Sequence, residues 1–155
     1  MMRALKEASY VGFVGIIVAG MSILGLRNGM TIGLVILGLG LLPMLGITLS
    51  GRKLTSSIPD LIFGLIDTGL LVIPAIAGAK YFGTIGAITG GVVGDAITDA
   101  VAGFFEGGVA RWLREHGILE SRDPITASLG KMAGCLVGGG FVMTLASIMG
   151  ISLNI

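Results

Sequence analysis

Two carboxylates lie four residues apart inside a long apolar stretch of the sequence. Asp95 and Asp99 fall within residues 81–105, which are otherwise rich in glycine and aliphatic side chains. Residues four apart share one face of an α-helix, so this spacing predicts two acids on one face of a membrane helix. Acids in such surroundings are costly to place and mark proton or ion pathways. The pair is therefore the first candidate for chemistry.

Two further ionisable residues are expected at a similar depth. Asp67 precedes the chain break at Lys80 by 13 residues, and Asp95 follows it by 15. At 1.5 Å per residue, both should lie about 20 Å from that break. Lys131 lies six residues after Ile125, at the start of the next apolar stretch, and should reach about the same layer from the opposite side. We expect these groups to face inward and meet. The predicted ion or proton pathway consists of Asp67, Asp95, Asp99, Lys131, Thr68, Thr98 and Glu106.

The charge balance of this cluster allows two interpretations. Three carboxylates beside one ammonium cannot all remain charged away from water, so at least one acid should hold a proton or bind a cation. That imbalance is what a proton or cation pathway uses. Alternatively, Lys131 pairs with one acid, the others bond to threonines, and the cluster only fastens helices together.

The composition indicates that lipid is the solvent. Of 155 residues, 54% are hydrophobic and 12% are charged, against roughly 25% charged in a soluble domain. Mean hydropathy is +0.98. A net charge of +1 gives no reason to expect a nucleic-acid partner. The single Cys135 excludes an intrachain disulfide or a cysteine metal site. We expect no cofactor, and whether the acids bind a metal ion stays open.

The elements that must position the acids are long apolar stretches, since a spanning helix needs roughly 20 residues. Residues 107–120 mix apolar and charged residues at helical spacing, which predicts a short amphipathic helix in the membrane interface; a solvated extension of the preceding helix is the alternative. The sequence thus predicts an all-α integral membrane protein, a single domain over residues 1–155 with about five transmembrane helices. The five spans are residues 10–26, 30–49, 59–79, 81–105 and 125–155.

Positive residues near helix ends predict the orientation. With five spans, seven of them fall on one side: Arg3, Lys6, Arg52, Lys53, Arg111, Arg114 and Arg122. Arg27 and Lys80 fall on the other side. We therefore expect a plasma (inner) membrane protein with a cytoplasmic amino terminus and an outside carboxyl terminus.

Glycines repeat every four residues in the last two spans. The first row is Gly86, Gly90 and Gly94, and the second is Gly130, Gly134 and Gly138. Such rows form glycine zippers, which let membrane helices approach closely, so we expect these two helices to pack face to face. The rows could also serve a homo-oligomer or contacts with other membrane subunits.

Two enzyme motifs are matched in part. Gly94-Asp95 facing Asp67 resembles the paired aspartates of intramembrane aspartyl proteases, but the first glycine of Gly-x-Gly-Asp is Val92 here. Gly91-x3-Asp95-x3-Asp99 is similar to the end of the CDP-alcohol phosphotransferase signature, whose preceding half is missing. No catalytic residues are assigned, and we expect that the protein is not an enzyme. The favoured function is proton or cation transport; the alternative is a non-catalytic accessory subunit of a membrane complex.

Overall fold

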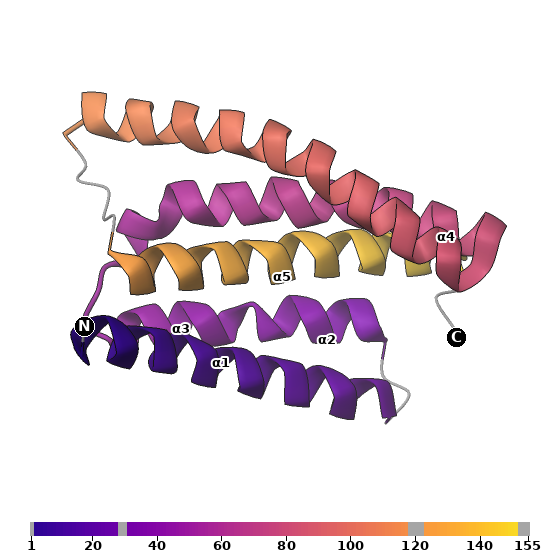
Figure 1. Ribbon diagram of the computed structural model, residues 1–155, viewed down its shortest axis with the longest axis horizontal. Helices are drawn as coiled ribbons and strands as arrows, with labels where there is room; N and C mark the ends of the chain where they lie inside the picture. The colour runs from indigo at the N-terminus through magenta and orange to yellow at the C-terminus, as the bar shows by residue number, and fades with distance from the viewer. Residues whose placement is uncertain (1, 28–30, 118–122, 152–155) are drawn as a thin grey trace.

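The computed structural model describes residues 2–27, 31–117 and 123–151, which are helical throughout apart from short connections and contain no strand. Figure 1 shows the helices lying side by side, with α5 between α4 and the group formed by α1, α2 and α3. Within these described residues, four helical stretches are long and apolar enough to cross a membrane, namely residues 4–27, 32–49, 54–115 and 124–148. The elements are α1 (Met2–Arg27), α2 (Ile32–Leu39), α3 (Leu41–Leu49), the 3-10 turn η1 (Leu54–Ser57), α4 (Ile58–Glu115) and α5 (Pro124–Ile148).

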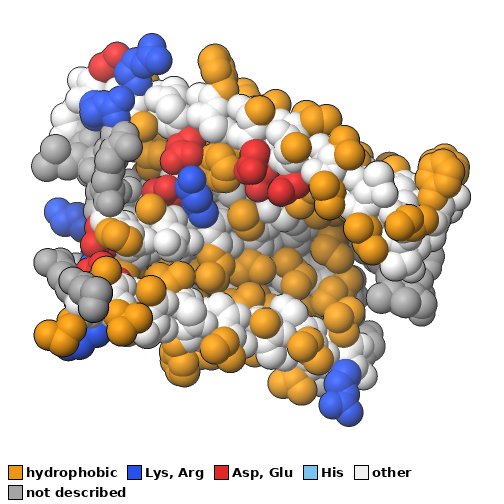
Figure 2. Space-filling view, viewed as in Figure 1, with side chains coloured by type: hydrophobic (Ala, Val, Ile, Leu, Met, Phe, Trp, Pro, Cys, Tyr) orange, Lys and Arg blue, Asp and Glu red, His pale blue; other side chains and the backbone are white. Residues whose placement is uncertain are grey.

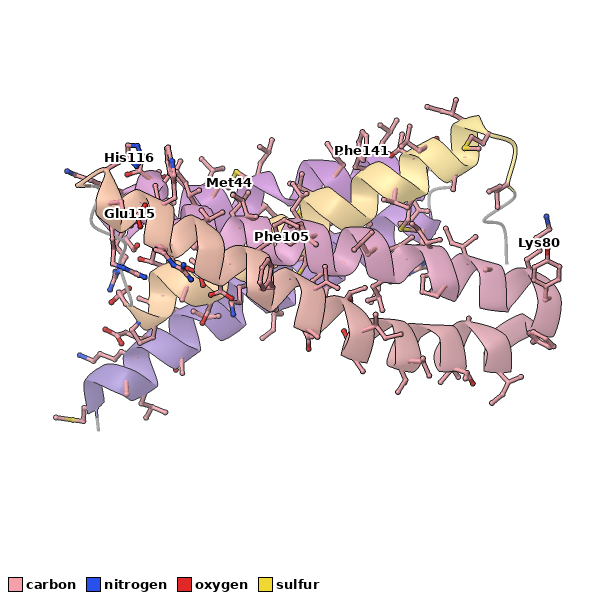
Figure 3. The ribbon with its side chains drawn as sticks, turned by 90° about the horizontal axis from the view of Figure 1, so that it is seen from above. Met44, Lys80, Phe105, Glu115, His116 and Phe141 are labelled. Carbon is pink, nitrogen blue, oxygen red and sulfur yellow. The ribbon has the colours of Figure 1, made fainter. Side chains whose placement is uncertain are left out.

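The number of long helices, four, differs from the expected five because α4 contains two of the predicted spans. Gly83 has φ 61° and ψ −147° and lies outside the helical conformation, a backbone geometry that is essentially restricted to glycine. The chain reverses there, so α4 is a hairpin with a first arm (residues 58–82) and a second arm (residues 84–115). Figure 3 shows Lys80 at the turn, far from Glu115 and His116. The break expected at Lys80 therefore lies three residues later.

A proline divides the second predicted span. The pyrrolidine ring of a proline clashes with the carbonyl four residues earlier and its nitrogen donates no hydrogen bond. For Pro43 that carbonyl belongs to Leu39, where α2 ends, and α3 begins at Leu41. The span at residues 32–49 is thus two short helices that continue one another.

The prediction of a separate interfacial helix at residues 107–120 is wrong. The second arm of α4 runs without interruption to Glu115, because Ala110 and Leu113 stay buried on the face that continues the packed side of this arm. The alternative, an extension of the preceding helix, matches the structure. Residues 118–120 of that segment lie outside the described residues, as do Arg122 and the last four residues of the final predicted span.

The hydrophobic core lies where α1, α2 and α3 pack on α5. Leu129 and Ile47 are fully buried, and Val14, Val18, Leu39 and Ile125 complete this cluster. Many large aliphatic and aromatic side chains instead point outward from every long helix. A lipid environment would solvate such an exterior without cost, because lipid tails are as apolar as leucine.

The two glycine rows were expected to face each other, but in the structure they do not. A Cβ built on Gly90 would lie less than 3.0 Å from the carbonyl group of Pro74, and one on Gly134 equally close to that of Leu61. Both neighbours belong to the first arm of α4. Because the chain reverses at Gly83, the first arm takes the contact of each row. Gly86 and Gly94 meet the first arm on one side, and Gly130 and Gly138 meet it on the other.

Candidate functional site

Asp67 is buried between the two arms of α4. Its side chain is 6% exposed, and Thr98 Oγ1 on the second arm donates a hydrogen bond of 2.5 Å to its Oδ1. Asp67 lies 16 residues before Gly83 and Thr98 lies 15 after it, so the position of the turn sets this pairing. Asp67 was expected at the level of Asp95, and the later turn moves it level with Thr98.

Asp95 and Asp99 do not face inward, which corrects the expected meeting of all four ionisable groups. Both lie on the exposed side of the second arm. The face of this arm that packs on the first arm carries Gly94 and Thr98. Each aspartate is one residue further along, which turns its side chain by about 100°. The two acids still lie near enough to Asp67 to interact with it electrostatically, as does Lys131.

Lys131 on α5 pairs with Glu106 and not with an aspartate of the arms. Its Nζ lies 3.4 Å from Glu106 Oε2 and 4.1 Å from the ring centroid of Phe63. A cation over an aromatic face gains further electrostatic attraction. The ammonium is thus held among three segments: α5, the second arm through Glu106, and the first arm through Phe63. Figure 2 shows acidic and basic side chains gathered between the second arm and α5.

A polar hollow of about 650 Å³ surrounds this ion pair. Asp60, an acid that the sequence analysis missed, lines it and is 7% exposed. Asp60 precedes Asp67 by seven residues, or two helical turns, and this spacing was the signal that could have found it. Ser56 and Ser128 also line the hollow. Carboxylates, an ammonium and hydroxyls therefore meet in one hollow.

Thr68 faces α5, whereas Asp67 faces Thr98 of the second arm. The side chain of Thr68 lies over Gly139. Of the two threonines expected to join the acids, Thr98 does so directly. Thr68 instead contributes to the contact between α4 and α5.

No matching family model, curated protein or solved structure is found for this chain. Function is therefore argued from the geometry of the site. Within residues 2–27, 31–117 and 123–151, no group of three or more His, Cys, Asp or Glu side chains could hold a metal ion. The described groups can instead exchange protons, pair with a cation, or hydrogen-bond a polar molecule.

A second group of charged side chains joins the helices at the end of the bundle where α5 begins. Arg52, in the connection after α3, makes two contacts with Asp123 at 2.5 and 2.8 Å and lies 3.9 Å from Glu7 of α1. Asp123 also accepts a hydrogen bond from the Thr126 backbone and caps α5. The hydrogen bond from Arg52 lowers the pKa of Asp123, and the same bond raises the pKa of Arg52. This network joins α1, α3 and α5.

Proposed function

We propose that this chain is an integral membrane protein that moves protons or a small cation. The observation that carries the proposal is the buried Asp67, hydrogen-bonded to Thr98 inside an apolar hairpin. Ionisable residues at such depth are expensive, and their usual role is functional. We place the protein in the plasma (inner) membrane, with the amino terminus cytoplasmic and the carboxyl terminus outside, from the distribution of positive residues.

In this proposal, the polar hollow is the cytoplasmic entrance of a route that leads past Asp60 toward Asp67. Asp60 and Asp67 lie two turns apart on one helix, a separation of about 10 Å. Glu106 and Lys131 stand at the hollow and Asp99 lies near Asp67. A proton or cation that enters the hollow would meet carboxylates at successive depths, of which Asp67 is the most enclosed by the arms.

The exposed acids indicate that the working unit contains more than one chain. Asp95 and Asp99 would face lipid in a single copy, at a cost of several kcal/mol for each charged group. Contact with a second copy or another membrane subunit would remove that cost. A homo-oligomer that buries this side of the second arm would also complete the pathway beyond Asp67.

An accessory role in a membrane complex is the second candidate. Among the described residues, every buried side-chain nitrogen or oxygen has a hydrogen-bond partner, as expected if the polar groups only fasten helices. In that case Asp67 and Thr98 form a bond between the arms, and the chain contributes surfaces to its partners.

The two candidates differ in what the loss of a titratable group does. Asp67→Asn keeps an oxygen that can accept the bond from Thr98 but removes proton exchange. In liposomes, the wild type should pass protons or a common cation. Asp67→Asn should fall to the flux of protein-free liposomes while its thermal stability stays within about 1 kcal/mol of wild type.

The matched control is Glu115→Gln, which removes an acid on an exposed side chain at the end of α4. Its flux should equal that of the wild type. If wild type passes none of the ions tested, the accessory role replaces transport. If wild type is active and Asp67→Asn is equally active, the ions do not pass through Asp67 and the proposed pathway is wrong.

A further inference from the structure

The hydroxyl of Thr98 has two acceptors within reach. Its Oγ1 lies 2.5 Å from Asp67 Oδ1 on the first arm and 3.3 Å from the backbone carbonyl oxygen of Asp95, three residues earlier on its own helix. A threonine hydroxyl carries one hydrogen and can also accept hydrogen bonds, so it points its hydrogen at one of these oxygens at a time. The shorter contact has the length of a hydrogen bond to an ionised carboxylate.

Both protonation states of Asp67 can therefore be paired without a change of the backbone. When the carboxylate is charged, Thr98 donates to its Oδ1. When a proton binds the carboxylate, the new O–H can donate to Thr98 Oγ1, while the threonine hydrogen turns to the Asp95 carbonyl oxygen. Release of the proton reverses these rotations, and no bond of the threonine is broken. Because an unpaired buried polar group is costly, this exchange of partners eases both uptake and release.

The seam between the arms offers few ligands to a metal cation. Phe63 lies one turn before Asp67 and stands beside Gly103 of the second arm. Leu71 lies one turn after Asp67 and packs over Gly94. Between these apolar neighbours, a cation would find one carboxylate and one hydroxyl. Ca²⁺ and Mg²⁺ take six or more oxygen ligands, and K⁺ filters use rings of carbonyl oxygens.

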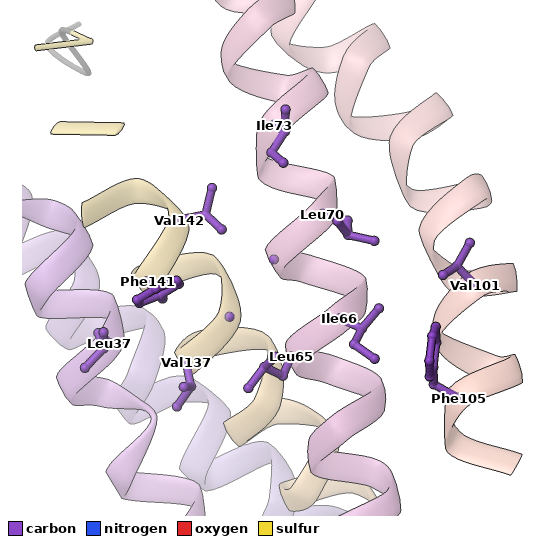
Figure 4. Close-up of a pocket in the computed structure, with 12 residues that line it drawn as sticks. Leu37, Leu65, Ile66, Leu70, Ile73, Val101, Phe105, Val137, Phe141 and Val142 are labelled. Carbon is purple, nitrogen blue, oxygen red and sulfur yellow. The ribbon is translucent and has the colours of Figure 1, made fainter. Parts of the chain in front are cut away.

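The space beside the seam is apolar too. Figure 4 shows a groove of about 620 Å³ with Ile66 and Leu70 of the first arm and Val101 of the second arm on its walls. Ile66 directly precedes Asp67, and Val101 follows Thr98 by three residues. The side chains that line this groove contain no oxygen or nitrogen, so a cation that left water would gain no ligand from them. A proton needs only one oxygen and one hydrogen-bond partner, which Asp67 and Thr98 provide.

Charged and titratable groups on two neighbouring elements act on Asp67. Asp95 and Asp99 lie on the second arm, Lys131 and Cys135 lie on α5, and all four interact with Asp67 electrostatically. The two acids stay on the exposed side of their arm, and they do not form a group of metal ligands with Asp67. All four groups contribute to the pH at which Asp67 exchanges its proton, whereas the Thr98 hydroxyl is bonded to it directly.

On the basis of the proposed transport function, we propose that the ion moved is the proton, and that Thr98 is a positioning residue that pairs with Asp67 in both its charged and its neutral state. Metal cations are thereby excluded as substrates of the pathway through Asp67.

Fluxes of several ions into liposomes that contain wild type test the substrate. Wild type should pass protons under a fixed membrane potential, while its fluxes of Na⁺, K⁺ and Mg²⁺ equal those of protein-free liposomes. Flux of any of these metal cations through wild type would overturn the proton assignment and leave transport standing. Absence of flux for every ion, protons included, would instead reject the proposed function and this assignment with it.

Thr98→Val tests the hydroxyl, because it keeps the shape of the side chain and removes the donor. The charged form of Asp67 then loses a hydrogen bond, so release of the proton needs a higher pH. The pH at which proton flux is half-maximal should rise by about 1–2 pH units, the shift that one hydrogen bond to a charged group gives. Thr98→Ser, which retains the hydroxyl, should keep the wild-type pH profile.

Thr89→Val is the matched control, since Thr89 is an exposed residue of the same arm, and its pH profile should equal that of wild type. Thr98→Ala, which also lacks the hydroxyl, replaces Thr98→Val if the latter does not fold. A folded variant that lacks the hydroxyl and still shows the wild-type pH profile would overturn the role of Thr98.

Discussion

Arg52 fastens three segments that are far apart in the sequence. Its guanidinium contacts Asp123 at the start of α5 and approaches Glu7 of α1, while Ser50 at the end of α3 accepts another of its bonds. Two parallel contacts between a guanidinium and a carboxylate are strong and directional. Because the pair is only about one fifth exposed, water competes with it less than with a surface ion pair.

We predict that Asp123→Asn lowers the free energy of unfolding by roughly 1–2 kcal/mol at pH 7, because the ion pair is lost while Asn can still cap α5. The lowered pKa of Asp123 also predicts the pH dependence. Its stabilisation is fully present above the unfolded pKa of about 3.9 and is lost as pH falls through the folded value. Thermal unfolding in detergent between pH 7 and pH 3 measures both effects.

Glu115→Gln is the control for this measurement, since Glu115 is exposed at the end of α4 and should leave both the stability and its acid dependence unchanged. An Asp123→Asn protein with the wild-type melting temperature at every pH would show that the ion pair between Arg52 and Asp123 does not stabilise the fold.

The helices illustrate how much the sequence could predict. The long apolar stretches were found, and Asp67 and Thr98 were both assigned to the candidate site, because hydrophobicity and residue type are local properties. Their pairing was not predicted, because it depends on a turn at Gly83 instead of Lys80. Moving a hairpin turn by three residues lengthens one arm and shortens the other, so the register between the arms changes by about six residues. Asp95 was therefore placed level with Asp67, where the structure has Thr98.

Burial was also beyond a reading of spacing alone. Asp95 and Asp99 share a helical face, as expected, but the pattern could not tell whether that face meets the first arm or the exterior. The glycine row determines which face of the second arm packs on the first arm, since Gly90 lies against Pro74. The aspartates lie on another face of the same arm and are therefore exposed. A row of small residues predicts a close contact but does not name the partner helix.

Adjacent glycines in the second arm allow a matched test of this packing. Gly90→Leu should lower the free energy of unfolding by about 1–3 kcal/mol, because its side chain would press on the carbonyl group of Pro74 and force the arms apart. Gly91→Leu should be neutral or stabilising, since nothing lies within 4 Å of a Cβ there and leucine favours helix more than glycine does. Thermal unfolding of both variants in one detergent provides the measurement.

Similar losses at Gly90 and Gly91 would mean that the second arm does not pack closely on the first through this face.

At the scale of the whole molecule, the two ends of the bundle differ. α1 begins and α5 ends at opposite ends (Figure 1). The space-filling view shows Lys and Arg side chains mostly near the end where α1 begins, with a further basic group at the other end (Figure 2). This asymmetry supports the proposed orientation, in which the end rich in cations faces the cytoplasm.

Reporter fusions test this orientation. Fusions after Lys53 and after Gly117 should report the cytoplasm, and a fusion after Ile151 should report the outside, because α4 returns to its starting side and α5 crosses once more. A fusion after Arg27 should also report the outside and serves as an internal reference. Cytoplasmic signals from both Lys53 and Ile151 would contradict the proposed crossing of α5.

The reversal at Gly83 has a consequence for biosynthesis. The arms of α4 are joined by a tight turn at Gly83, with Lys80 beside it (Figure 3) and no long polar segment between the arms. In the proposed membrane setting, Asp67 would enter the bilayer before its hydroxyl partner has left the ribosome. The favourable route is for both arms to partition together as a preformed hairpin, with Thr98 already bonded to Asp67.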